Sequence, residues 1–324
     1  MSGELIASVQ HVAHSATPRE HVAILLGTRN GAGFLGPQLD SIGAQTHGEW
    51  SVWASDDGST DATTVVLAEY RRRWGAERLF LKRGPVRGFC ANFLSLVCAP
   101  QIHADYFAYC DQDDLWDHDK LERALKWLRK QAPGQPALYC GRTRLIDANG
   151  RALGNSPLFA RPVGFANAIV QSVAGGNTMV FNAAARALLV EAGGEVDVQT
   201  HDWWTYIVVA ACGGVVHYDA RPAVGYRQHP DNLVGSNHGA RSKVARARRL
   251  LAGEFREMNH RNLAALGRLS RRLTPESRNI LEMFCRARSA SLPARTIAAW
   301  KSGIYCHTLL GNSGLALAAV LKKL

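Results

Sequence analysis

The sequence lacks the features that mark secreted, membrane-spanning and zinc-binding proteins. Its seven cysteines are odd in number and include no Cys-x-x-Cys pair, which argues against a disulfide framework or a zinc site. It contains no run of about 18 uninterrupted apolar residues, which a transmembrane helix would need. Residues 1–20 contain no apolar segment like that of a signal peptide. We therefore expect a cytoplasmic protein with reduced thiols.

Acidic residues are scarce toward the C-terminal end. The whole chain has 38 Lys and Arg against 27 Asp and Glu, a formal net charge of +11. Residues 240–324 hold 17 of the basic residues but only 4 glutamates and no aspartate, so they carry +13 and leave −2 for residues 1–239. Such a basic tail is typical of contact with nucleic acid or anionic lipid, or it has no partner at all.

Strands and helices are predicted to alternate in the first half of the chain. With 324 residues, 47% of them hydrophobic, the chain can form one large α/β domain plus an appendage. Alternation of this kind predicts a doubly wound, mostly parallel sheet, with a ligand crevice beyond the C-terminal ends of its strands. The apolar runs expected to form the first four strands are residues 21–26, 50–54, 79–81 and 106–110.

Three regions follow from the composition and periodicity. They are a polar leader at residues 1–20, an α/β domain at 21–239 and a basic, amphipathic helical tail at 240–324. The tail is expected to contain one helix over about 241–272 and another that begins after Thr274, with Pro275 as its first residue. Residues 151–172 have weak periodicity and are expected to form a surface loop with a short helix.

An acidic cluster follows the fourth expected strand. Asp111, Asp113 and Asp114 place three carboxylates within four residues. Like charges this close repel each other, and hard divalent cations such as Mg²⁺ bind carboxylate oxygens together with substrate phosphates. A metal site explains the cluster, and a solvated acidic turn is the alternative.

Residues 31–36 read GAGFLG and match the G-x-G-x-x-G pattern of dinucleotide-binding proteins. In that motif the first glycine directly follows the strand, whereas residues 27–30 intervene here. A nicotinamide-dependent oxidoreductase is therefore retained only as an alternative.

Four stretches together resemble the family 2 inverting glycosyltransferases of the GT-A fold. They are residues 28–31, 56–61, 111–114 and 201–202. Further stretches resemble the branch with bacterial rhamnosyltransferases that build cell-surface polysaccharide, and the resemblance covers about residues 21–235. These further stretches are residues 38–42, 45–46, 92–93, 110–116, 201–204 and 226–229.

The resemblance implies an α/β GT-A fold, with a doubly wound, Rossmann-like sheet and a basic helical extension. It also implies an inverting transferase that uses Mg²⁺ or Mn²⁺ and moves a hexose from a nucleoside diphosphate-sugar to a lipid-linked saccharide acceptor, as in lipopolysaccharide synthesis. L-Rhamnose from dTDP-L-rhamnose is the specific expectation for the donor. The implied location is the cytoplasm, with peripheral attachment to the cytoplasmic face of the inner membrane as an option.

The resemblance also implies roles for individual residues. The residues expected to bind the metal are Asp111, Asp113 and His229, and Asp114 either ligates too or caps a helix at Trp116. The residues expected to contact the nucleotide are Thr28, Asn30, Asp56, Asp57, Asp111 and Arg227. For Asp57 the alternative is a structural cap of the next turn through Ser59 and Thr60, and for His229 it is a purely structural role.

Asp202 resembles the acidic residue that acts as catalytic base. Inversion at the anomeric carbon requires a base that removes the proton of the attacking acceptor hydroxyl. The Glu that usually precedes this residue is replaced by His201, as in the rhamnosyltransferase-like branch. The alternative for Asp202 is an N-cap of the following helix. Trp203 and Trp204 are expected either to stack on the acceptor sugar or to belong to the core.

Two further readings concern the basic tail. A nucleic-acid-binding protein is one alternative, but the tail lacks interleaved aromatic residues and any helix-turn-helix or zinc pattern. The other question is what the apolar stripe of the tail contacts: an anionic lipid surface, or the α/β domain or a second subunit. The sequence leaves this choice open.

Overall fold

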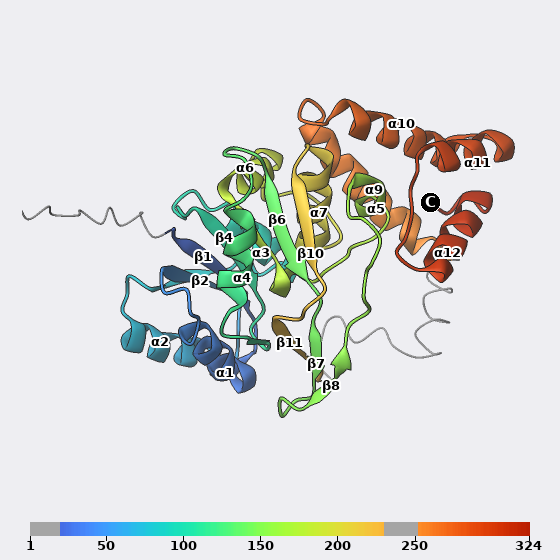
Figure 1. Cartoon of the computed structure of the whole chain (residues 1–324). Coiled ribbons are helices and arrows are strands. Elements are labelled where there is room, and N and C mark those ends of the chain that lie inside the picture. Colours follow the sequence, from blue (N-terminus) through green and yellow to red (C-terminus); the bar gives the residue numbers. More distant parts are fainter. Residues whose placement is uncertain (1–19, 230–251) are drawn as a thin grey trace, which may run out of the picture.

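The computed structural model describes residues 20–229 and 252–324 (Figure 1). In these residues, eleven strands form two sheets. The larger sheet contains β1 (Val22–Thr28), β2 (Trp50–Asp56), β3 (Leu79–Arg83), β4 (Tyr106–Cys110), β6 (Ala137–Gly141), β9 (Val180–Asn182) and β10 (Val215–Asp219). The smaller sheet contains β5 (Leu115–Trp116), β7 (Arg144–Ile146), β8 (Ala152–Asn155) and β11 (Val224–Arg227).

The larger sheet has the order β10-β6-β9-β4-β1-β2-β3. Its neighbours are parallel except at β9, which runs antiparallel to both β4 and β6. The chain forms β1, β2 and β3 in one direction and then returns to place β4 on the other side of β1. This doubly wound, mostly parallel sheet confirms the predicted fold class.

The continuous apolar run of β1 is explained by burial on both faces of the sheet. Its side chains from Val22 to Leu26 are all 0% exposed. Because successive side chains of a strand point to opposite faces, Ala23 and Leu25 enter one core, and Val22, Ile24 and Leu26 enter the other. A strand covered on one face only would have alternated apolar and polar residues.

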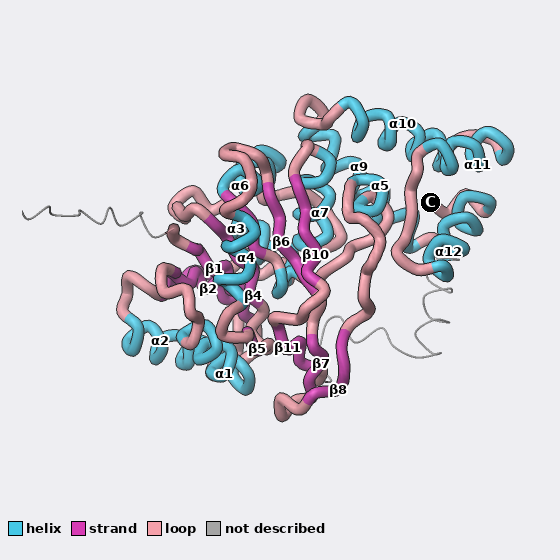
Figure 2. The backbone as a smooth tube through the Cα atoms, viewed as in Figure 1, coloured by secondary structure: helices cyan, strands magenta, loops and turns pink. Residues whose placement is uncertain are grey.

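Helices cover both faces of this sheet (Figure 2). One core receives Leu35 of α1 (Ala32–Gly43), Leu67 of α2 (Thr63–Trp74) and Leu121 of α4 (Lys120–Leu128). The other receives Phe93 of α3 (Phe89–Val97), together with apolar residues of α5 (Phe165–Ala168), α6 (Ala183–Ala192) and α7 (His201–Ala211). None of the helices in the described segments combines the length and the apolar character needed to cross a membrane.

Residues 252–324 contain four α-helices. They are α9 (Glu254–Leu266), α10 (Pro275–Ser289), α11 (Leu292–Lys301) and α12 (Leu309–Val320). The predicted cap is present, because Thr274 Oγ1 accepts a hydrogen bond from the Ser277 N–H at 3.0 Å ahead of α10. Leu266 and Leu269 are buried in the same core as α7, so the described part of the α9 stripe packs on the α/β domain. Some of the predicted features lie outside the described residues. They are residues 241–251 of the expected tail helix, the expected boundary at 239/240 and the leader up to residue 19.

Phe284 of α10 offers a test of this shared core, since its side chain is 0% exposed in the cluster that also contains Trp204. Phe284→Ala is expected to lower the free energy of unfolding by about 3–5 kcal/mol, because it removes a large buried ring and leaves a cavity. Urea unfolding followed by tryptophan fluorescence should show one transition at a lower midpoint. Leu292→Ala, at a 48% exposed position, is the control. Loss of α10 helicity without a change in the main transition would contradict the shared core.

Two local predictions need correction. Trp116 begins no helix and lies in strand β5. The region 151–172 contains the expected short helix, α5, but the predicted loop also contains strand β8, which pairs antiparallel with β7.

Candidate functional site

The candidate site lies where the direction of strand addition reverses. β1 pairs with β2 on one side and with β4 on the other, so the loops after these strands diverge at the C-terminal edge of the sheet. In doubly wound sheets this divergence creates the ligand crevice. Thr28, Asp56 and Cys110 are the last residues of the three strands, and the acidic stretches identified in the sequence follow at this edge.

Hydrogen bonds join the turn after β1 to the turn after β2. The Thr28 hydroxyl donates to Asp56 Oδ1 at 3.0 Å, and the Ser59 N–H donates to Asp56 Oδ2 at 2.9 Å. Asn30 has a positive φ of 48°, a conformation that asparagine tolerates. Its Oδ1 accepts from the Thr60 N–H at 2.8 Å. Thr28, Asn30 and Asp56 are therefore brought together, as the sequence predicted.

Asp57 has a different partner from the one expected. Its side chain is 1% exposed, and its two oxygens accept from the N–H groups of Val86 at 2.6 Å and Gly88 at 2.8 Å. The predicted cap through Ser59 is made by Asp56 instead. Since the Asp57 carboxylate is buried and bonded to the 84–88 turn, its expected contact with a nucleotide is replaced by a positioning role. Asp56 remains the candidate for that contact.

Gln112 is a site residue that the sequence analysis missed. Its Oε1 accepts from the Arg29 N–H at 2.8 Å and its Nε2 donates to the Arg29 carbonyl at 2.9 Å. A Cβ on Gly31 would lie 2.1 Å from Gln112 Oε1, so only glycine allows this approach. The first glycine of the G-x-G-x-x-G pattern is thereby explained by packing and needs no dinucleotide.

Asp111 and Asp114 are destabilised as anions. Asp114 is 0% exposed and accepts from the Arg227 N–H at 3.1 Å and from Asn177 Nδ2. Burial, and then the Asp113 charge, raises the pKa of Asp114 to about 7. Burial also raises the pKa of Asp111 well above its usual value, with further contributions from Asp114, Asp113 and Asp202. Asp114 caps no helix, so that alternative is wrong.

Asp113 contacts His229, and Phe34 of α1 stacks on the ring of that histidine. His229 Nε2 is 3.0 Å from Asp113 Oδ2, and the His229 ring stacks on Phe34 with 4.7 Å between the ring centroids. Phe34 also contacts the Arg227 guanidinium, which lies 5.0 Å from the centroid of the ring. No sequence pattern had pointed to Phe34, because its neighbours are far away along the chain.

Arg227 is placed differently from the prediction. Its side chain is 4% exposed and donates from Nε to the Asp113 carbonyl at 2.8 Å and from Nη1 to the Ala148 carbonyl at 2.6 Å. A guanidinium buried on backbone carbonyls cannot present a fork to a phosphate. The guanidinium that was expected to contact the nucleotide is instead buried, and it holds the backbone at Asp113 and Ala148.

The side chains expected to ligate a metal ion fit a divalent cation only in part. In the described segments, no three His, Cys, Asp or Glu side chains converge closely enough to hold an ion by themselves, so the predicted Asp111, Asp113 and His229 set is not preassembled. The fit rests on Asp111, which carries no hydrogen bond to its carboxylate from the described residues, although three other carboxylates act on it. Mg²⁺ commonly binds through one or two carboxylates plus substrate phosphates, and Asp111 and Asp113 can supply such carboxylates.

Asp202 faces this cluster from the start of α7. It is not the N-cap: that position belongs to Thr200, whose hydroxyl accepts from the Trp203 N–H at 3.4 Å. Asp202 Oδ2 accepts from the Gly176 N–H at 3.1 Å and Oδ1 from the Trp203 N–H at 2.7 Å. The carboxylate is thus oriented by two backbone groups, and its charge contributes to the raised pKa of Asp111.

The residues around Asp202 belong to the core. Trp203 is 5% exposed and Trp204 0%, and Trp203 Nε1 donates to the Ala168 carbonyl at 2.7 Å. The option that the two tryptophans stack on an acceptor sugar is wrong. His201 is 3% exposed and stacks on Phe93 with 4.0 Å between the ring centroids.

His201 makes a pH-dependent contribution to stability. Burial lowers its pKa from 6.5 to about 4, so the unfolded chain binds the proton more readily. Stability present above pH 6.5 is therefore lost as the pH falls toward 4. Between pH 7.5 and pH 4.5 the free energy of unfolding should decrease in both proteins. The decrease should be smaller by about 2–3 kcal/mol in His201→Leu than in the unmodified protein. Urea titrations at both pH values measure this difference, and identical pH dependence in the two proteins would contradict it.

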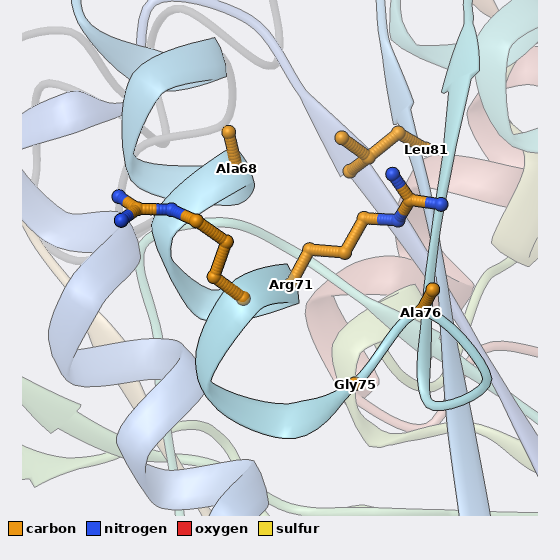
Figure 3. Close-up of a pocket in the computed structure, with 6 residues that line it drawn as sticks. Ala68, Arg71, Gly75, Ala76 and Leu81 are labelled. Carbon is orange, nitrogen blue, oxygen red and sulfur yellow. The ribbon is translucent and has the colours of Figure 1, made fainter.

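Two hollows of the surface lie away from the acidic cluster. One, of about 430 Å³, is lined by residues of α2 and the β3 region, including Arg71 and Leu81 (Figure 3). Another, of about 270 Å³, is lined by Cys90, Asp197 and Arg261 among others. Neither is lined by Asp111, Asp113 or Asp202.

Comparison with known proteins agrees with the geometry. Residues 23–185 match the family model described as glycosyl transferase family 2. The chain is 26% identical over 234 residues to the dTDP-rhamnosyl transferase RfbG of Shigella flexneri, covering 68% of this chain and 77% of that protein. It is 27% identical over 132 residues to an uncharacterized glycosyltransferase of Rickettsia typhi, covering 41% of this chain and 39% of that protein.

One solved structure shares the architecture. The crystal structure of residues 1–349 of Staphylococcus aureus TarS, in complex with UDP-GlcNAc, superposes with a TM-score of 0.54 at 14% identity. The match covers 93% of this chain and 90% of that one. This likeness supports the fold.

Proposed function

The chain belongs to glycosyl transferase family 2, and on that basis we propose that it is an inverting hexosyltransferase that uses a divalent cation. The observation that carries the proposal is the arrangement of Asp111 and Asp202. Asp111 directly follows β4 and Asp202 lies in the first turn of α7, and the charge of Asp202 contributes to the raised pKa of Asp111. Such an arrangement can hold a donor diphosphate on one side and an acceptor hydroxyl on the other.

Asp202 is the proposed general base. Its carboxylate oxygens accept from the N–H groups of Gly176 and Trp203, which orient the carboxylate before the acceptor arrives. Each oxygen keeps a further lone pair for the acceptor proton. A base in this position takes the hydroxyl proton while the oxygen attacks the anomeric carbon from the face opposite the leaving group, and inversion follows.

The strand ends β1 and β2 are the proposed nucleotide site. Asp56, held by Thr28 and Ser59, can accept a hydrogen bond from the base or the ribose. Asp57 keeps the neighbouring 84–88 turn in place through two N–H groups. Asp111 and Asp113, with His229 beside Asp113, would hold the cation, which would neutralise negative charge on the departing diphosphate.

The proposed donor is dTDP-L-rhamnose and the proposed acceptor a lipid-linked saccharide of cell-surface polysaccharide synthesis, at the cytoplasmic face of the inner membrane. The similarity to a dTDP-rhamnosyl transferase over 68% of the chain supports this choice of donor. His201 in place of the usual Glu before the base is a feature that the chain shares with the rhamnosyltransferase-like branch, and its buried ring packs against Phe93 and Tyr109.

A donor panel tests the proposal. The purified chain is incubated with dTDP-L-rhamnose, UDP-GlcNAc or GDP-mannose, with Mg²⁺, Mn²⁺ or EDTA, and release of the nucleoside diphosphate is measured. Release from dTDP-L-rhamnose alone, and only with a cation, is the expected result. Binding of each nucleotide can be followed by thermal shift, since ligands that bind the native state raise its stability. Release from another donor would overturn the sugar assignment, and equal release with EDTA would overturn the cation requirement.

A further inference from the structure

Exposed apolar side chains gather at the C-terminal end of the chain. Of the 15 exposed large apolar side chains in the described residues, 8 fall within residues 292–321. We define the α11–α12 surface by Ile297 and Trp300 on α11, and by Leu309, Leu310, Leu317 and Val320 on α12. Trp300 is 81% exposed and Leu309 is 88% exposed. A concentration of this kind on a soluble domain marks an interaction site.

The two helices are apolar on more than the face that packs inward. In α12, Leu315, Ala318 and Ala319 are buried in the core, while Leu310 and Leu317, two helical turns apart, point to solvent. α12 contains no charged residue at all. An apolar helix face is normally covered by protein or lipid, whereas the leucines on the outward face of α12 are exposed in the described structure.

The charges around this surface have one sign. Residues 290–324 contain Arg295, Lys301, Lys322 and Lys323 and no acidic residue. Lys301 follows Trp300 directly, and the two C-terminal lysines follow α12. A second copy of the same surface would bring these cations face to face, which disfavours a symmetric dimer. An apolar surface edged by lysine, with an exposed tryptophan, matches the boundary between anionic headgroups and acyl chains.

We propose that the α11–α12 surface binds an anionic lipid bilayer in a peripheral manner. Its apolar side chains enter the headgroup boundary, and its lysines lie among the anionic headgroups. This surface replaces the α9 stripe considered in the sequence, because α9 packs on the core through Leu266. Figure 1 shows α11 and α12 on the side of the molecule away from α1 and α2. Lipid binding requires neither donor nor acceptor, so the proposal does not depend on the proposed function.

Trp300 supplies a specific probe. Seven of the eight tryptophans are buried or half-buried, and Trp300 alone is exposed. When the full chain is added to vesicles of phosphatidylcholine and phosphatidylglycerol, we expect cosedimentation and a blue shift of the exposed tryptophan emission. Trp300→Phe should keep cosedimentation and lose the shift. Binding should fall with rising salt and be weaker on vesicles of phosphatidylcholine alone.

A double variant decides whether this surface is responsible. Leu309→Ser with Leu310→Ser should lower the vesicle partition coefficient about tenfold or more, while circular dichroism and thermal unfolding stay unchanged because both positions are exposed. Val65→Ser with Leu153→Ser, at positions 65% and 59% exposed on the α/β domain, is the matched control and should bind normally. Equal binding by the two double variants overturns the proposal. A concentration-dependent dimer that only Leu309→Ser with Leu310→Ser abolishes also overturns it, because the surface would then be a subunit interface.

Discussion

Asp202→Asn is expected to lower the rate of sugar transfer by a factor of about 10²–10⁴, the usual contribution of a positioned general base. Asparagine has nearly the same shape, and its amide oxygen can still accept from the Gly176 or Trp203 N–H, the two groups that orient the carboxylate. It cannot take a proton from an acceptor hydroxyl. Initial rates of diphosphate release with saturating donor and acceptor measure the loss.

Donor binding separates this role from a structural one. Because the proposed base acts on the acceptor hydroxyl and not on the donor, Asp202→Asn should bind the donor nucleotide with nearly unchanged affinity, measured by calorimetry. Asp40→Asn is the control, since Asp40 is an exposed residue paired with Arg73 and should retain full activity. Transfer at the normal rate by Asp202→Asn would show that another group is the base.

Asp113→Asn is expected to reduce cation-dependent turnover by about 10²–10³-fold, because a charge contact to the cation on the leaving diphosphate is lost. The amide keeps the size of the side chain and an oxygen for the contact with His229, which is 3.0 Å from the carboxylate now. Mn²⁺ titration followed by electron paramagnetic resonance, in the presence of nucleotide, should show weaker binding in this variant.

The stability of Asp113→Asn, in contrast to its activity, should not decrease. The Asp113 charge raises the pKa of buried Asp114, so Asp113→Asn removes a repulsion that opposes ionisation of Asp114. The free energy of unfolding without added cation should be equal or higher than in the unmodified protein, as at other sites where function costs stability. Asp197→Asn, at an exposed ion pair with Arg261, should change neither property. A marked loss of stability in Asp113→Asn would indicate a structural role instead.

The strands, the strand-end loops and the family resemblance could be predicted because their signals are local. A run such as residues 22–26 is apolar at every position only if the strand is covered on both faces, and the structure shows it so covered. Turn residues and acids directly follow these runs, and this order predicts Thr28, Asp56 and Asp111 at one edge of the sheet. The order of these elements then followed from the alternation of strand and helix.

Side-chain roles could not be predicted in the same way, because each depends on a partner far along the chain. Asp56 and Asp57 are adjacent in the sequence, yet one bonds Thr28 and the other the turn at Val86. Arg227 was expected to contact the nucleotide, but its guanidinium donates a hydrogen bond to the distant Ala148 carbonyl.

Local pattern along the chain was therefore sufficient for the fold class, the doubly wound order and the location of the acidic crevice, since hydrophobic periodicity and turn chemistry act between near neighbours. Packing between distant segments settled the rest: that Asp57 and Arg227 are buried supports, that Trp203 and Trp204 are core, and that α11 and α12 each bury one face in the core and leave apolar side chains exposed on another. Burial is a property of all the segments that surround a side chain, and a single segment does not contain it.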